Sequence, residues 1–189
     1  MRGKTNPFPA FEYALLGLLY REPAHGYELH KIIADPAGIG IIWGIKIANL
    51  YAQLAKLERT GLIKGEEQAG EDRPARTEYK LTETGKAAFE TWLTDVVQHP
   101  REFRQEFMLR YYFLAQYRQD MLNENCQVQL KDCQTWLDNS KKRQETAGKN
   151  SFTRAILEFR TSQIQSMVDW LKQLMARPPI TLFPKEKQA

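Results

Sequence analysis

The spacing of hydrophobic residues predicts three helices in the first third of the chain. Residues 11–19 (FEYALLGLL) are almost wholly apolar, and Pro23 ends this first helix because proline cannot continue one. A second helix is expected over about 25–34. Apolar residues then recur at helical spacing over 47–61, which predicts a third, amphipathic helix that stops at Gly61, a residue suited to a left-handed cap.

The third predicted helix has two dissimilar faces. At about 100° per residue, one arc carries aliphatic side chains that we expect to be buried: Ile47, Leu50, Leu54 and Leu57. The opposite arc carries small, amide and basic side chains: Ala48, Asn49, Ala52, Lys56 and Arg59, with Gln53 at its margin. Such a face suits entry into a DNA groove, because amides pair with base edges and cations neutralise phosphates. An ordinary solvated helix has a similar outer face, so the pattern alone does not separate the two interpretations.

Beyond Gly61 the hydrophobic period changes from helical to alternating, which predicts a two-stranded hairpin. One strand begins at about Leu62, the other covers 76–81, and the polar segment 69–74 predicts a turn between them. Thr82 then suits the N-cap of a fourth helix.

After Pro100 the pattern is helical only. An aromatic-rich helix is predicted from Glu102 to about Tyr117, followed by a long helix with one narrow apolar stripe: Leu122, Cys126, Leu130, Cys133 and Leu137. Ser151 is expected to cap a last helix whose apolar arc covers about half its circumference and which ends near Arg177. Packing against one neighbouring helix requires a narrower apolar arc than this. We therefore expect the last two helices to form an antiparallel hairpin, with the remaining apolar face of the last helix against another subunit.

The predicted architecture is therefore mainly α. Three helices, a hairpin and a fourth helix follow the order of a winged helix-turn-helix, which we assign to residues 1–98. Residues 99–177 are expected to form an antiparallel helical dimerisation domain, and residues 178–189 a flexible tail.

The net charge of the whole chain does not indicate DNA binding, but the local charge of one segment does. The formal net charge is +4, but residues 1–100 hold 12 Lys/Arg against 13 Asp/Glu, so the excess lies in residues 101–189. Within 46–64, however, four basic residues oppose the single acid Glu58: Lys46, Lys56, Arg59 and Lys64. This local positive charge coincides with the helix whose outer face suits DNA.

Several classes of protein are excluded by missing motifs. The sequence has no run of about 18 apolar residues and no apolar signal-peptide core near its N-terminus, so we expect a cytoplasmic protein without a membrane partner. It has no nucleophile elbow, phosphate-cradling glycine loop or zinc motif, so we expect neither an enzyme nor a cofactor. The three histidines lack metal-ligand spacing, and Cys126 and Cys133 are expected to be core thiols rather than a disulfide or metal pair.

Three segments resemble the PadR family of transcriptional regulators in order and spacing. They are HGYELHKII (25–33), LYAQLAKLERTGLIKGE (50–66) and RPARTEYKLTETGKAAFETWL (73–93). The resemblance spans about residues 11–94 and implies a winged helix-turn-helix, a homodimer held by C-terminal helices, and usually repression at a palindromic operator in double-stranded DNA. The helices that follow Arg101 are similar to the longer, virulence-activator-like branch of the family.

The expected DNA contacts come from the third helix and the hairpin. Lys46 departs from the family pattern, which often has Ser or Thr there as a cap, so this lysine lies either inside or before the first turn. Tyr51 matches a DNA-contacting tyrosine of the family, although its place at the border of the buried arc fits packing equally well. Hairpin cations are expected on the DNA backbone or minor groove, with a solvated acidic loop as the alternative. The full set is Lys46, Asn49, Tyr51, Ala52, Gln53, Lys56, Arg59, Lys64, Arg73 and Arg76.

The resemblance also implies a small, often planar aromatic effector that releases the repressor. Five aromatic residues are candidates to line its pocket, with core or dimer packing as the alternative: Trp92, Phe107, Tyr111, Trp136 and Trp170. The competing function for the whole chain is a winged-helix module that contacts another protein and does not bind DNA. The slight acidic excess of residues 1–100 favours that alternative.

Overall fold

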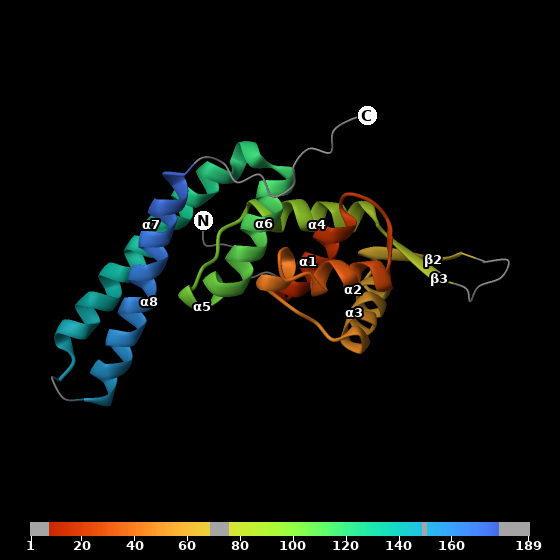
Figure 1. The fold of residues 1–189 in the computed structure, drawn as a ribbon. Helices are drawn as coiled ribbons and strands as arrows, with labels where there is room; N and C mark the ends of the chain where they lie inside the picture. Colours follow the sequence, from red (N-terminus) through yellow and green to blue (C-terminus); the bar gives the residue numbers. More distant parts are fainter. Residues whose placement is uncertain (1–7, 69–75, 149–150, 178–189) are drawn as a thin grey trace. The chain divides into compact units, whose positions relative to one another are not determined.

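The structure is a computed structural model that describes residues 8–68, 76–148 and 151–177. The chain divides into two compact units (Figure 1). The first comprises the described residues of Met1–Asp95 together with Met108–Phe113, and the second those of Val96–Phe107 and Leu114–Ala189. The predicted mainly α architecture, with a winged helix before long C-terminal helices, is confirmed. The domain boundary placed at residue 98 stays a prediction.

The three predicted N-terminal helices are present. They are α1 (Ala10–Leu19), α2 (Gly26–Ala34) and α3 (Ile47–Arg59), with a short 3₁₀ turn, η1 (Ile39–Ile41), before α3. Gly61 has a φ of 74°, the left-handed conformation expected of it. The N–H of Gly61 donates to the carbonyl of Glu58 at 2.9 Å, and that of Leu62 donates to the carbonyl of Leu57 at 3.0 Å, which closes the end of α3.

The wing is a three-stranded antiparallel sheet, rather than the predicted two-stranded hairpin. Its strands are β1 (Ala24–His25), β2 (Ile63–Gln68) and β3 (Arg76–Leu81), in the order β1-β3-β2. Strand β1 pairs Ala24 with Tyr79, a partner 55 residues away along the chain. Two residues are too short to show an alternating pattern, which is why the sequence did not indicate this strand. The predicted turn at 69–74 lies outside the described residues.

Helix α4 (Glu83–Thr94) begins at its predicted cap. The Thr82 hydroxyl accepts the N–H of Gly85 at 3.0 Å. Gly85 also permits a close approach, because a Cβ atom there would lie 1.9 Å from the carbonyl oxygen of Leu62. The first turn of α4 is thereby held directly against the start of the wing.

The core of the first unit is aliphatic on α1, α2 and α3 and aromatic on α4. Its fully buried side chains include Leu15, Leu16, Leu29, Leu50, Leu54, Leu57 and Phe89. The prediction that Ile47 is buried was wrong, because 43% of this residue is exposed. Hydrophobic periodicity predicts which side of a helix faces the core, but it does not predict how far along the helix the neighbouring elements extend. Ile47 lies in the first turn of α3, on the buried side but beyond the part of the helix that is covered.

The second unit is built on a long helical hairpin of α7 (Gln119–Thr146) and α8 (Phe152–Met175), seen as adjacent ribbons in Figure 1. Ser151 caps α8 as predicted, since its hydroxyl accepts the N–H of Arg154 at 3.2 Å. Cys133 is buried in the narrow stripe of α7, while the Ser140 and Thr161 hydroxyls lie 2.8 Å apart and join the two helices.

The aromatic-rich segment is divided into three parts, where a single helix was predicted. These are α5 (Pro100–Glu102), the π-helical turn η2 (Phe103–Phe107) and α6 (Met108–Tyr117). The rings of Phe103 and Phe107 stack at 4.5 Å, and both lie nearly perpendicular to the ring of Trp170 from α8. A π turn brings residues four apart onto one face with wider spacing, which the average helical period does not reveal.

Candidate nucleic-acid interface

Lys46 lies immediately before α3, which resolves the two positions left open for it. Its backbone is extended (φ −72°, ψ 142°), and its carbonyl accepts the N–H groups of Asn49 and Leu50. No side chain caps this end of the helix. An exposed lysine therefore adjoins the positive end of the helix dipole, where an anion such as a phosphate is favoured.

The outer face of α3 is exposed except at Lys56, which is half-buried. Its exposed members among the predicted DNA contacts are Asn49, Ala52 and Arg59, with Ala48 beside them. Glu58, the one acid of this helix, accepts the N–H of Gly65 at 2.8 Å and thereby joins α3 to strand β2. The face thus combines a polar amide, two small residues and a cation, and its carboxylate is turned toward the protein.

Tyr51 is packed against the protein and yet partly exposed. A Cβ atom added at Gly26 would lie 2.6 Å from Cε1 of Tyr51, so the tyrosine ring packs closely on the first turn of α2. The residue nevertheless remains 44% exposed. Gly26 is therefore needed for this packing, and Tyr51 keeps enough free surface to contact a ligand.

Two of the predicted contacts lie at the inner margin of the face. The Lys56 ammonium is 2.5 Å from Oε1 of Glu12, a residue of α1 that is only 1% exposed. Gln53 is half-buried, and its Oε1 atom is buried without a hydrogen-bond partner in the described part of the chain. Both side chains are directed at least partly toward the protein, in contrast to Asn49 and Arg59.

Two lysines of the wing are paired with an acid, whereas Arg76 has no ionic partner among the described residues. Oε1 of Glu66 lies 3.1 Å from Nζ of Lys64 and 2.6 Å from Nζ of Lys80. The hydrogen bond from Lys80 is the main reason that the pKa of Glu66 is lowered, with Lys64 second. Arg76, opposite Gln68 on the neighbouring strand, is exposed and forms no ion pair with any described residue. Arg73 lies outside the described residues.

A groove of about 730 Å³ joins α2, α3 and strand β3. Its lining includes two residues already predicted, Tyr51 and Arg76, and six that were not: His25, Gly26, Tyr27, Glu28, Lys31 and Thr77. Glu28 accepts the N–H of His25 at 2.8 Å, and the His25 ring lies 3.1 Å from the carbonyl oxygen of Thr77.

The HGYE motif (25–28) therefore holds this groove together, while the tyrosine within it remains exposed. Tyr27 and Lys31 are one helical turn apart, which places both on one face of α2. That spacing was visible in the sequence and would have identified them as further candidates.

The five aromatic effector candidates do not all lie in one unit. Trp92 is buried in the first unit, where it stacks on Tyr13 at 5.0 Å and carries the Arg110 guanidinium 5.2 Å from its ring centroid. Phe107 is buried in the second unit. Packing, the alternative considered for these residues, accounts for both. The other three are half-buried, Tyr111 in the first unit and Trp136 and Trp170 in the second.

Other chemistry is scarce among the described residues. In residues 8–68, 76–148 and 151–177, no three His, Cys, Asp or Glu side chains gather as a metal site would require. Burial raises the pKa of the Cys126 thiol to about 11 and that of Cys133 to about 12, so both are unreactive core thiols. No helix in the same ranges has the length and apolar composition needed to cross a bilayer.

The sequence is similar to known transcriptional regulators. Residues 15–91 match the model of the Transcriptional regulator PadR-like family. The chain is 30% identical over 104 residues to the negative transcriptional regulator PadR of Bacillus subtilis, a match that covers 55% of this chain and 56% of that protein. The chain therefore matches about half the length of this relative. Residues 15–91 end before the C-terminal helices, so the virulence-activator-like branch stays a prediction.

Solved structures with similar folds include two of B. subtilis PadR. One is its complex with operator DNA, with a TM-score of 0.46 and 23% identity, covering 89% of this chain and 98% of that one. The other is its complex with p-coumaric acid, with a TM-score of 0.42 and the same identity and coverage.

Proposed function

This chain belongs to the PadR-like family of transcriptional regulators, and from that premise we propose that it is a homodimeric repressor that binds a palindromic operator. It is a regulator and not an enzyme. The observation that carries the proposal is the exposed outer face of α3, which begins at Lys46 and ends at Arg59 and adjoins a groove lined by Arg76.

In the proposed complex, α3 occupies the major groove. Its 13 residues make a helix of about 20 Å. Ala48 and Ala52 allow close approach, Asn49 reads base edges, and Lys46 and Arg59 neutralise phosphates at either end. Arg76, Tyr27 and Lys31 then contact the flanking backbone from the groove between α2 and the wing. Lys56, Gln53, Tyr51, Lys64 and Arg73 remain proposed contacts, of which Lys56 and Lys64 already have acidic partners within the protein.

Repression is proposed from the relative's name, since the B. subtilis protein is a negative transcriptional regulator. Release by a small molecule is part of the same proposal. Of the predicted effector residues, Tyr111, Trp136 and Trp170 retain exposed surface for such a ligand.

A second copy of the chain is proposed to cover an apolar stripe on α8. Phe152, Ile156 and Phe159 recur at helical spacing along this helix and are 82%, 37% and 61% exposed. A contiguous, exposed apolar stripe of this kind is typical of a protein interface. Two-fold symmetry would place two copies of α3 on the two halves of a palindrome.

The direct test is to select DNA fragments bound by the full-length protein and to measure the affinity of the recovered site at several salt concentrations. We expect a recurrent palindromic site, and an affinity that falls steeply with salt because phosphate contacts release counterions. Absence of binding, or binding that does not depend on salt, would overturn the proposal.

One observation favours the competing protein-contact function. Ile41 and Ile47, at 80% and 43% exposed, flank the start of α3 with apolar rather than charged surface. If this module binds a protein, Ile41→Ser should abolish capture of that partner while the chain shows no preference among DNA fragments. Under the DNA proposal, the same variant still selects the palindromic site.

A further inference from the structure

An acidic residue of α1 is paired with a lysine of the helix that is proposed to enter DNA. Glu12 lies in the first turn of α1 and is only 1% exposed, although it carries a carboxylate. Its Oε1 atom lies 2.5 Å from Nζ of Lys56 on α3. Lys56 is also one of the proposed phosphate contacts, so the carboxylate of Glu12 and a DNA phosphate would bind the same ammonium group.

The burial of Glu12 makes this ion pair difficult to break. Its second carboxylate oxygen, Oε2, is buried and has no hydrogen-bond partner in the described part of the chain. Lys56 is the one cation among the described residues that lies within ion-pair distance of the carboxylate. A buried carboxylate that loses its cation leaves an uncompensated charge in the interior, which is strongly unfavourable. The protein therefore opposes any movement of the Lys56 ammonium away from Glu12.

Lys56 is the accessible member of the pair. Its side chain is 40% exposed. An ammonium group has three donors, and Glu12 accepts one of them, so a phosphate can still approach the others. The positive charge that would attract the phosphate is, however, compensated by the carboxylate beside it. Lys56 therefore attracts a phosphate much less strongly than a lysine without an acidic partner does.

The other cations near α3 are not restrained in this way. Lys46 and Arg59, at the two ends of the helix, are exposed and form no ion pair with a described residue. Lys64 pairs with Glu66, but both side chains are exposed, and exposed pairs contribute little and exchange readily. Burial of the acid thus distinguishes the pair of Lys56 from that of Lys64.

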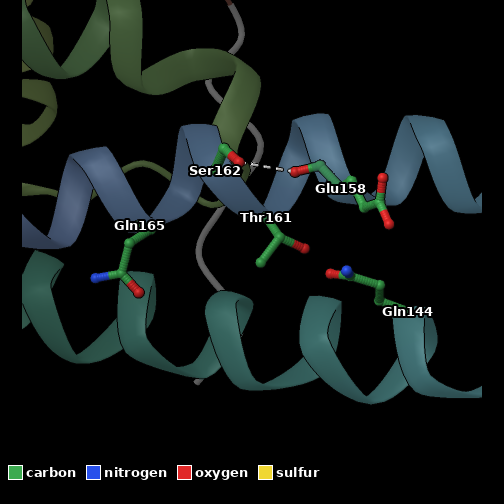
Figure 2. Close-up of a pocket in the computed structure, with 5 residues that line it drawn as sticks. All are labelled: Gln144, Glu158, Thr161, Ser162 and Gln165. Carbon is green, nitrogen blue, oxygen red and sulfur yellow. Dashed lines mark hydrogen bonds between the residues drawn. The ribbon is translucent and has the colours of Figure 1, made fainter.

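An acid in the second unit shows the ordinary arrangement. Glu158 is exposed and pairs with Nε of Arg154 at 3.0 Å, so water can replace either partner at little cost. It lines a polar hollow between α7 and α8 together with Gln144, Thr161, Ser162 and Gln165 (Figure 2). None of these five described side chains has a buried polar atom without a hydrogen-bond partner. The buried, incompletely bonded carboxylate of Glu12 therefore calls for an explanation that Glu158 does not require.

We propose that Glu12 competes with DNA phosphate for Lys56 and thereby limits the affinity of the protein for DNA of any sequence. Phosphate contacts supply essentially all of the affinity for random DNA, and a compensated lysine adds little to it. Sequence-independent binding then depends on Lys46, Arg59 and Arg76, the exposed cations without an ionic partner among the described residues. This inference rests on the proposed function, because it concerns the strength of DNA binding.

The first test removes the charge of the competitor. Glu12→Gln keeps an oxygen that can accept from Lys56 but frees the charge of the ammonium group. We expect this variant to bind a random-sequence duplex about three- to tenfold more tightly and to raise the salt slope by about 1, as one additional phosphate contact would. Glu22→Gln is the control, because it removes the same charge from an exposed position of the same unit and should leave the slope unchanged. Fluorescence anisotropy at several salt concentrations measures both.

The second test removes the whole pair, and it remains decisive if Glu12→Gln does not fold. In Glu12→Gln/Lys56→Met neither charge is left, so we expect the parent's salt slope on random DNA to change by much less than 1. Arg59→Ala is the matched comparison, since it removes an exposed cation of the same helix, and it should lower the slope by about 1.

Three outcomes overturn this inference while leaving the proposed function intact, provided that the parent binds DNA with a steep salt dependence. The first is an unchanged slope in a folded Glu12→Gln variant. The second is a double variant whose slope falls as far as that of Arg59→Ala, which would show that Lys56 contacts phosphate in spite of Glu12. The third is a rise in slope for Glu22→Gln equal to that for Glu12→Gln. If neither the parent nor any variant binds DNA, the proposed function fails and this inference fails with it.

Discussion

The ammonium of Lys56, on the third helix of the winged domain, lies 2.5 Å from the carboxylate of Glu12, which is almost completely buried. The second carboxylate oxygen of Glu12 is buried without a hydrogen-bond partner in the described residues. Lys56 is therefore first a stabilising partner of α1, and its proposed phosphate contact competes with this ion pair. A substitution at Lys56 would therefore alter the stability of the fold as well as any binding to DNA.

We expect Lys56→Ala to lower the free energy of unfolding by about 1–3 kcal/mol, since it leaves Glu12 buried without its cation, although the exposure of Lys56 reduces the loss. The double variant Glu12→Gln/Lys56→Met should recover most of this stability. Urea unfolding measures both effects, with Lys86→Ala, an exposed lysine on α4, as the control. A loss no larger than that of the control would refute the structural role of the pair.

The wing offers a comparison between two cations, only one of which has an ionic partner among the described residues. Arg76 forms no ion pair with a described residue, whereas Lys80 is held 2.6 Å from Glu66. We expect Arg76→Ala to weaken binding to all DNA sequences and to reduce the salt slope by about 1, because one phosphate contact is lost. Lys80→Ala should change the slope less. Fluorescence anisotropy at several salt concentrations measures both, and equal slopes in the two variants would contradict the assignment.

Asn49 is predicted to contribute to sequence selection rather than to overall affinity. Its side chain is exposed on the outer face of α3, and an amide that pairs with a base edge typically contributes about 1–3 kcal/mol of discrimination. Asn49→Ala should therefore narrow the difference in affinity between the selected site and random DNA, and leave binding to random DNA nearly unchanged. Competition binding measures this difference, and a parallel loss on both DNAs would assign Asn49 to the backbone instead.

Much of the fold was predictable because its signals are local. The end of α3 at Gly61 and the caps at Thr82 and Ser151 depend on residues within one turn, and the structure confirms all three. The exposed outer face of α3 also follows from periodicity. These features need no knowledge of distant parts of the chain.

The missed features depend on partners far away in the sequence. Glu12 lies in an apolar segment and is explained only by Lys56, 44 residues later. Strand β1 exists only because Ala24 pairs with Tyr79. Likewise, the groove around Tyr27 needs α2, α3 and β3 to be brought together. A single sequence gives residue types and periods, but it does not say which distant elements meet.

Gly85 lies where the first turn of α4 packs against the start of the wing, and a substitution there tests how much this contact contributes to stability. A Cβ at this position would lie 1.9 Å from the carbonyl oxygen of Leu62, whereas one at Gly44 would meet nothing within 4 Å. We expect Gly85→Ala to cost about 3 kcal/mol or more, because α4 must move away from a backbone atom that cannot yield easily. Gly44→Ala should be neutral or slightly stabilising, since it only restricts the unfolded chain. Thermal unfolding compares the two, and similar midpoints would show that α4 does not need its close approach to the wing.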